Sequence, residues 1–123
     1  MTPTKKFSEE RLRIEVTDNP EVIEVRWFGK SDQRNPNQFI VPIMQEVLKV
    51  GLDSKKQIVW NFVELDYMNS STITPIIKSL EQAKRSSNRV RVLYNRAKKW
   101  QDLSFSALRI FETKDGRIEV AGV

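Results

Sequence analysis

The chain has 123 residues and a formal net charge of +5, with 21 basic and 16 acidic side chains, and it contains neither cysteine nor histidine. These two absences exclude disulfides, thiolate nucleophiles and cysteine-ligated metal sites, and they remove both the usual general base and the commonest metal ligand. The length is typical of one domain. We therefore expect a single domain over residues 1–123 that needs no metal or cofactor.

The ends and the hydropathy of the chain indicate where it functions. No apolar run approaches the roughly 20 residues of a membrane-spanning helix, and the first six residues lack the apolar stretch of a secretory signal. We expect a cytoplasmic protein with no membrane partner. Residues 1–9 show no clear periodicity and are predicted to be a flexible N-terminal segment.

The first third of the chain predicts two strands and a helix. Charged and apolar side chains alternate over residues 11–16 and again over residues 22–28, and a turn at residues 18–21 joins them, which is typical of an antiparallel hairpin. Residues 29–35 are predicted to form a polar loop. Apolar side chains at helical spacing over residues 39–48 then predict a helix that Gly51 ends, and Pro42 must lie near its first turn or kink it.

The remainder predicts strands that alternate with helices. The apolar run over residues 58–63 indicates a central strand covered on both faces, and a narrow apolar stripe over residues 73–83 indicates a helix. A strand over residues 89–94 follows, and a short strand over residues 117–120 closes the chain. Between them a third helix should bury its apolar stripe, which consists of Ala97, Trp100, Leu103, Ala107, Leu108 and Phe111. The order ββαβαβα(β) predicts an α/β domain with a mixed four- to five-stranded sheet and about three helices, its later strands parallel.

Short polar side chains cluster between the central strand and the second helix, at Asn69, Ser70, Ser71 and Thr72. Such side chains cap helices, and Thr74 before Pro75 offers a second cap. One cap needs only one side chain, however, and this position falls at the carboxyl edge of the sheet, where α/β proteins bind ligands. A phosphate on a hydroxyl here would add about −1.5 to −2 charges beside the helix amides and would alter any docked partner.

The layout from the hairpin to the third helix resembles the STAS domain of bacterial anti-anti-sigma factors. In that family a strand ends in an Asp-Ser-Ser-Gly-like motif, whose first hydroxyl residue is phosphorylated by a partner kinase that also acts as an anti-sigma factor. The resemblance places Ser70 at the phosphoacceptor, with Asn69 in place of the Asp and Thr72 in place of the Gly. Gly29 and Asp32 match a Gly-x-x-Asp turn, whose acid lies beside the acceptor.

The segment from Tyr67 to Ile73 is more similar to SiaC-type proteins, which have Tyr, then Asn, then a Thr acceptor followed by two Ser and an Ile. The resemblance implies a protein that is phosphorylated by a dedicated kinase, is dephosphorylated by a PP2C-type phosphatase, and can activate a diguanylate cyclase when unmodified. The resemblance implies Ser70 as the acceptor, with Ser71 and Thr72 as secondary acceptors or capping neighbours, and the Ser in place of Thr leaves the assignment open between Ser70 and Ser71. We expect Asp32, Asp66, Tyr67 and Asn69 to shape the switch loop and to bind the partner.

A basic segment carries the excess positive charge. Residues 82–101 contain seven basic side chains and no acidic one: Lys84, Arg85, Arg89, Arg91, Arg96, Lys98 and Lys99. With Tyr94 and Trp100 between them, the stretch from Lys84 to Trp100 is the basis of an alternative function, binding of single-stranded nucleic acid. The segment could equally serve an acidic protein partner, and we rank nucleic acid second.

Catalysis has no support in the sequence. Asp32, Glu64 and Asp66 match no known spacing of paired carboxylates, and no glycine-rich phosphate loop is present. Lys78 falls on a helix surface, where it would activate no serine. We therefore assign no catalytic residue and expect a protein that is the substrate of another enzyme.

Overall fold

The computed structural model describes residues 4–123, and within them the chain forms a mixed sheet of seven strands, three α-helices and one 3-10 helix. The strands are β1 (Thr4–Glu9), β2 (Leu12–Asp18), β3 (Val22–Ser31), β4 (Gln57–Asn61), β5 (Leu65–Met68), β6 (Arg89–Tyr94) and β7 (Ile118–Gly122). The helices are α1 (Asn37–Ser54), α2 (Ser70–Arg85), α3 (Lys99–Ser106) and the 3-10 helix η1 (Ala107–Phe111). The α/β class is confirmed, but the strand count exceeds the expected four to five.

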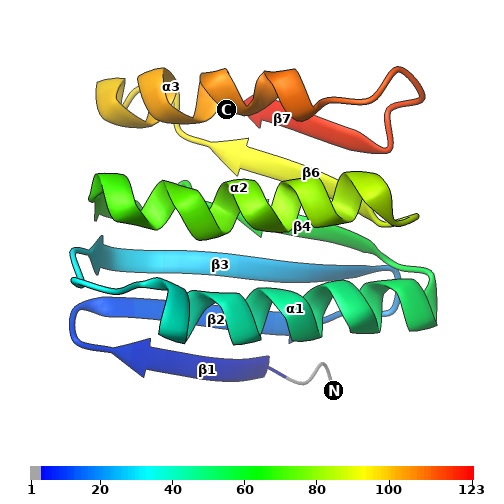
Figure 1. Cartoon of the computed structure of the whole chain (residues 1–123), viewed down its shortest axis with the longest axis horizontal. Helices are drawn as coiled ribbons and strands as arrows, with labels where there is room; N and C mark the ends of the chain where they lie inside the picture. Colours follow the sequence, from blue (N-terminus) through cyan, green and yellow to red (C-terminus); the bar gives the residue numbers. More distant parts are fainter. Residues whose placement is uncertain (1–3) are drawn as a thin grey trace.

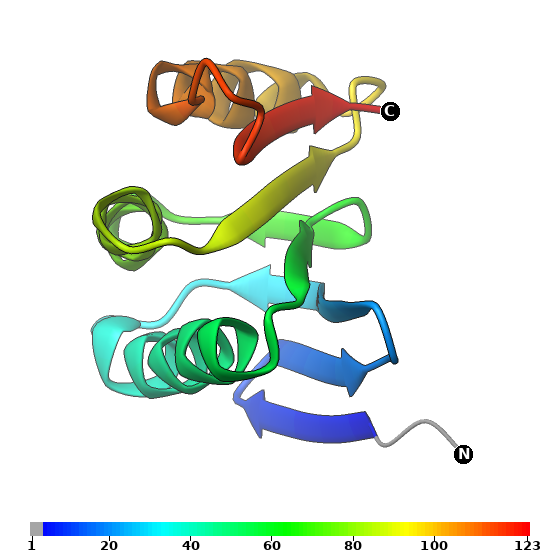
Figure 2. The same cartoon turned by 90° about the vertical axis from the view of Figure 1, so that its right-hand side faces the viewer.

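The sheet has an antiparallel and a parallel part. Its order is β1-β2-β3-β4-β6-β7, with β5 paired to β3 beyond the end of β4. The predicted β2–β3 hairpin is antiparallel, and β3, β4, β6 and β7 run parallel as expected. All helices lie on one face of this sheet (Figures 1 and 2), which leaves the other face without a helix layer.

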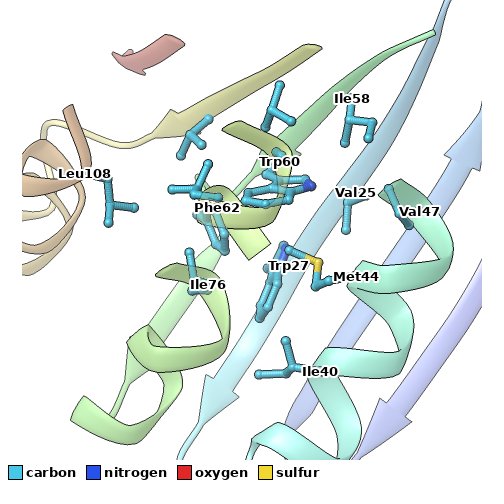
Figure 3. Packing of buried hydrophobic residues seen from close by; sticks show 14 of the residues in the cluster. Val25, Trp27, Ile40, Met44, Val47, Ile58, Trp60, Phe62, Ile76 and Leu108 are labelled. Atoms are coloured by element: carbon cyan, nitrogen blue, oxygen red, sulfur yellow. The ribbon is translucent and has the colours of Figure 1, made fainter. Parts of the chain in front are cut away.

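The core lies between the helices and the covered face of the sheet. Trp27 on β3 and Trp60 on β4 are fully buried there, and the Trp27 ring centroid lies 4.8 Å from that of Phe62. Figure 3 shows Met44 of α1 beside Trp27 and Ile76 of α2 near Phe62. The buried positions alternate along each strand, at Ile23, Val25 and Trp27 on β3 and at Ile58 and Trp60 on β4, as a half-buried strand requires.

Two expectations about the sheet need correction. The central strand β4 is not covered on both faces, because Ile58 and Trp60 are buried under the helices while Val59 lies on the uncovered face and is only half-buried. Residues 4–9, expected to be flexible, form β1, which pairs with β2 along its length. Phe7 is the one apolar residue in β1, so the sequence gives no alternation to detect; residues 1–3 lie outside the described residues.

Helix α1 continues past the residue predicted to end it. Gly51 is buried inside the helix, and a Cβ there would lie 2.8 Å from Ile58 Cδ1, so glycine allows close packing of α1 on β4. The helix ends instead at Ser54, and its C-cap Lys55 adopts a left-handed conformation with φ 56°. Pro42 lies five residues after the first residue of α1 and not in its first turn.

The third helical segment buries part of the predicted stripe, since Leu108 is buried and Trp100 and Phe111 pack half-buried on the core. The rest of the stripe differs. Gln101, Phe105 and Leu108 are buried, whereas Leu103 is 77% exposed and Ala107 also faces solvent. Leu103 is two residues from both Gln101 and Phe105 within α3, and this spacing places it on the opposite side of the helix from them. Gln101 is buried because its side chain binds the backbone: Nε2 donates to the carbonyls of Phe62 and Leu65.

Candidate functional site

The polar cluster at the start of α2 lies beside the end of β3. Strand β5 continues the pairing of β3 after β4 has ended, with Met68 opposite Ser31. The amide of Asn69 then donates to the carbonyl of Ser31 at 2.9 Å. The loop after β3 and the first turn of α2, which are distant in sequence, therefore meet at the carboxyl edge of the sheet.

Asn69 is the N-cap of α2. Its Oδ1 accepts hydrogen bonds from the Thr72 amide at 3.1 Å and from the Thr72 hydroxyl at 2.8 Å. Its Nδ2 donates to the carbonyl of Gln33 at 2.9 Å. The predicted capping role is thus carried by Asn69, and no second cap forms at Thr74, because Thr74 and Pro75 lie inside the helix.

Thr72 belongs to the interior of the protein. Its exposed fraction is 0%, and its hydroxyl lies 2.7 Å from that of Ser31, which is also fully buried. A kinase cannot reach this hydroxyl in the folded chain. The interpretation of Thr72 as a secondary phosphoacceptor is therefore inconsistent with its burial. Its hydroxyl instead links α2 to β3 through the hydrogen bond with Ser31.

Ser70 and Ser71 are both exposed in the first turn of α2. Because Asn69 supplies the cap, neither hydroxyl is needed to close the helix. Their amides have no hydrogen-bond acceptor within residues 4–123, as expected for the first turn of a helix. The first turn also contains no acidic side chain. Two accessible hydroxyls thus stand beside free amides and the positive end of a helix dipole.

Asp32 follows Ser31 directly and is 22% exposed at its side chain. Its carboxylate pairs with the guanidinium of Arg11 from the β1–β2 turn. The Arg11 carbonyl also accepts a hydrogen bond from the Lys30 amide at 3.0 Å. Arg11 is not among the predicted site residues, because nothing in the local sequence pattern connects it to residue 32.

Asp66 and Tyr67 lie on β5 and point away from the core. Tyr67 is 48% exposed, and the Asp66 carboxylate lies 3.7 Å from Nζ of Lys98. The same Nζ donates to the carbonyls of Val63 and Leu65. Tyr67 is therefore available to a partner, whereas Asp66 also helps to hold the turn before β5 against the loop after β6.

The basic segment does not form one surface. Lys84 and Arg85 lie in the last turn of α2, Arg89 and Arg91 point to the uncovered face of the sheet, and Arg96, Lys98 and Lys99 lie at the carboxyl edge, at or before the start of α3. These three groups occupy the helix layer, the opposite face and one end of the sheet.

The aromatic residues of the same segment are not free for stacking. Tyr94 is 1% exposed, and its hydroxyl accepts a hydrogen bond from Arg109. Trp100 is half-buried and packs against the core. Stacking of bases on these two rings, on which the nucleic-acid alternative depended, does not fit this arrangement.

Within residues 4–123, no group of three or more acidic side chains is placed to hold a metal ion. None of the helices in that range is both long and apolar enough to cross a membrane.

No family model matches the sequence, and no curated protein matches it. Among solved structures, the chain is similar to the anti-sigma factor antagonist SpoIIAA in its unphosphorylated form, with 18% sequence identity and a TM-score of 0.45. The similarity covers 74% of this chain and 72% of that one.

Proposed function

We propose that the protein is a phosphorylation-switched regulatory binding protein of the anti-sigma-factor-antagonist type, with Ser70 as phosphoacceptor and Ser71 as the alternative. The observation that carries the proposal is that different residues at the start of α2 cap the helix and present exposed hydroxyls. Asn69 and Thr72 close the helix through their side chains, while Ser70 and Ser71 remain exposed. These two hydroxyls can therefore change without a change in fold.

The switch acts through charge and volume. A kinase transfers the γ-phosphoryl group of ATP to the serine Oγ; the P–O bond to ADP breaks, ADP leaves, and the hydroxyl proton is lost to a base of the kinase. The new group carries about −1.5 to −2 charges. The free amides of the first turn and the helix dipole stabilise it. A partner docked over Ser70 and Tyr67 then meets a bulky dianion and is released.

The proposed partners rest on the resemblance of residues 67–73 to SiaC-type proteins. We propose a cytoplasmic system with a kinase that also binds the unmodified protein, a PP2C-type phosphatase that removes the phosphate, and a downstream target such as a diguanylate cyclase. Tyr67 supplies an exposed aromatic contact to these partners. In this scheme the protein is a substrate and a binding partner and performs no catalysis.

The decisive experiment incubates the protein with ATP and the GHKL-type kinase that is encoded nearest to it, then locates the phosphate by mass spectrometry. We expect phosphate on Ser70 or Ser71 and none in the double variant Ser70→Ala/Ser71→Ala. The matched control is Ser87→Ala, since Ser87 is an exposed serine just beyond the other end of α2. Phosphate in the double variant, or none in the wild type, would contradict the proposal.

A second experiment tests the charge itself. Binding of the kinase to Ser70→Asp should be at least about tenfold weaker than to Ser70→Asn, which has a similar size without the charge. Equal binding by the two variants would mean that phosphorylation acts otherwise than by charge. A salt titration with single-stranded DNA tests the nucleic-acid alternative, which predicts binding that weakens steeply with salt.

A further inference from the structure

The helix layer does not cover the whole sheet. Strand β1 is an edge strand, and in both views it lies beyond α1 with no helix over it (Figures 1 and 2). Between β1 and α1 runs a groove of about 760 Å³. This groove is remote from Ser70 in sequence and on a different part of the fold, since no residue of α2 lines it.

Apolar side chains line the floor and one wall of the groove. They come from the covered face of the first three strands and from one side of α1, and include Phe7, Val16, Ile23, Phe39, Val47 and Val50. Phe7, Val16, Phe39 and Val50 pack on the core but remain only half-buried. The lining residues of α1 extend from Gln38 to Val50, which at 1.5 Å per residue gives a length of about 18 Å.

The groove is bordered mainly by acidic side chains, although the net charge of the chain is positive. Glu9, Asp18 and Glu46 border it, with Lys5 as the one basic lining residue. Asp18 is paired with Lys56 at 2.6 Å, whereas Glu9 and Glu46 are exposed and have no ion-pair partner within residues 4–123. A protein with net charge +5 thus carries an apolar groove with a predominantly acidic border.

We propose that this groove docks a cationic amphipathic helix of a partner protein, which packs beside α1 as a further member of the helix layer. The length suits a helix of about three turns, and neighbouring helices pack at about 8–10 Å. Apolar residues at positions i, i+3, i+4 and i+7 would enter the groove, and lysines or arginines on the flanks would face Glu9 and Glu46.

The acidic border argues against other occupants. An anionic membrane surface would be repelled by Glu9 and Glu46. In a two-fold dimer built on this groove, each copy would bring the same carboxylates to the shared interface. A partner helix with basic flanks meets neither penalty, so charge complementarity favours it.

The test uses a synthetic peptide of about 16 residues with leucines at the four anchor positions and lysines elsewhere. Two control peptides carry glutamate in place of lysine, or the same composition in an order without an apolar face. The chain has no cysteine, so Gln38→Cys provides a single attachment site for an environment-sensitive dye at the groove. Gln45→Cys, exposed on the other flank of α1 and outside the groove lining, provides the control label.

We expect the cationic amphipathic peptide to change the dye emission at residue 38 but not at residue 45, and to bind at least about tenfold tighter than either control peptide. The double variant Glu9→Lys/Glu46→Lys should bind it about tenfold more weakly. Glu64→Lys/Glu119→Lys changes the net charge equally at exposed positions away from the groove, and it should bind like the wild type.

Three outcomes would overturn the proposal. The first is equal binding of all three peptides, and the second is equal weakening by both double variants, which would indicate attraction to the net charge alone. The third is self-association, detected by sedimentation of the unlabelled protein and abolished by Val50→Asp. Circular dichroism of each variant establishes that it is folded. If Val50→Asp unfolds, the two double charge variants still test whether the peptide binds at the groove.

Discussion

Helices α1 and α2 begin at the same edge of the sheet but are started in different ways. Helix α2 has a side-chain cap from Asn69, whereas α1 follows Pro36, which offers no side-chain hydrogen bond. Neither first turn contains an acidic residue, and each helix carries a proline five residues after its first residue, Pro42 in α1 and Pro75 in α2. Because Asn69 alone caps α2, the neighbouring hydroxyls of Ser70 and Ser71 are not needed to stabilise the helix start.

The two helix starts should differ most in the free energy of unfolding that is lost when the asparagine at each is replaced by alanine. Asn69→Ala removes the cap and two further hydrogen bonds, so we expect the free energy of unfolding to fall by about 2 kcal/mol. Asn37→Ala should change it by less than about 0.5 kcal/mol, because Asn37 Oδ1 has no hydrogen-bond partner within residues 4–123. Urea unfolding measures both, and equal losses would show that the cap is not what distinguishes α2.

The buried hydroxyl of Thr72 gives the next largest effect. Thr72→Val keeps the volume but leaves Ser31 Oγ and Asn69 Oδ1 each short of a partner, so unfolding should become easier by about 1–2 kcal/mol. Thr74→Val is the matched control on the same helix, since Thr74 is exposed. A similar loss for both variants would mean that helix propensity, and not the tie to β3, determines the cost.

A carboxylate in the first turn should make the two helices behave alike. Ser71→Asp and Gln38→Asp place a negative charge at the second residue of α2 and α1, both exposed positions. Each should stabilise the protein by about 0.3–1 kcal/mol at low ionic strength through the helix dipole. The gain should largely disappear in about 1 M salt. A gain in α1 alone would indicate that the cap of α2 already saturates its amides.

The smallest expected effect on stability is that of the proposed switch residues themselves. Ser70→Ala and Ser71→Ala should each change the free energy of unfolding by less than about 0.5 kcal/mol, because both side chains are exposed and Asn69 keeps the cap. Thermal unfolding of the two variants beside wild type checks this. A decrease in the free energy of unfolding near that of Asn69→Ala would show that these hydroxyls stabilise the fold, which would weaken the case for a switch.

Much of the fold was predictable because most strands and helices carry their own periodic pattern. Residues 12–18, 22–31 and 89–94 form strands where apolar side chains alternate. Strand β5 was not predicted, since Leu65 is its one buried residue and its partner is the end of β3. The stripe of the third helix was wrong at Leu103, because no local pattern shows that Gln101 would satisfy two buried carbonyls.

The candidate site was predictable in place but not in detail. The spacing of strand and helix located residues 69–72 at the carboxyl edge, and the structure places them there. The sequence pattern could not separate exposed Ser70 from buried Thr72, because the burial of Thr72 depends on Ser31, which is far away in sequence. The pairing of Asp32 with Arg11 is non-local in the same way.

Gly29 has a consequence for how this chain can diverge through evolution. It has φ 83°, and a Cβ at this position would lie 2.1 Å from the Arg11 carbonyl oxygen, at the irregularity where the pairing of β3 with β5 shifts. Any side chain there would push the β1–β2 turn away, and with it the arginine that holds Asp32. A lineage that loses this glycine should also lose the arginine–aspartate pair and the register that sets Asn69 beside Ser31. A glycine three residues before an aspartate is therefore a better mark of shared descent here than the serines, which mutation can replace at little cost to the fold.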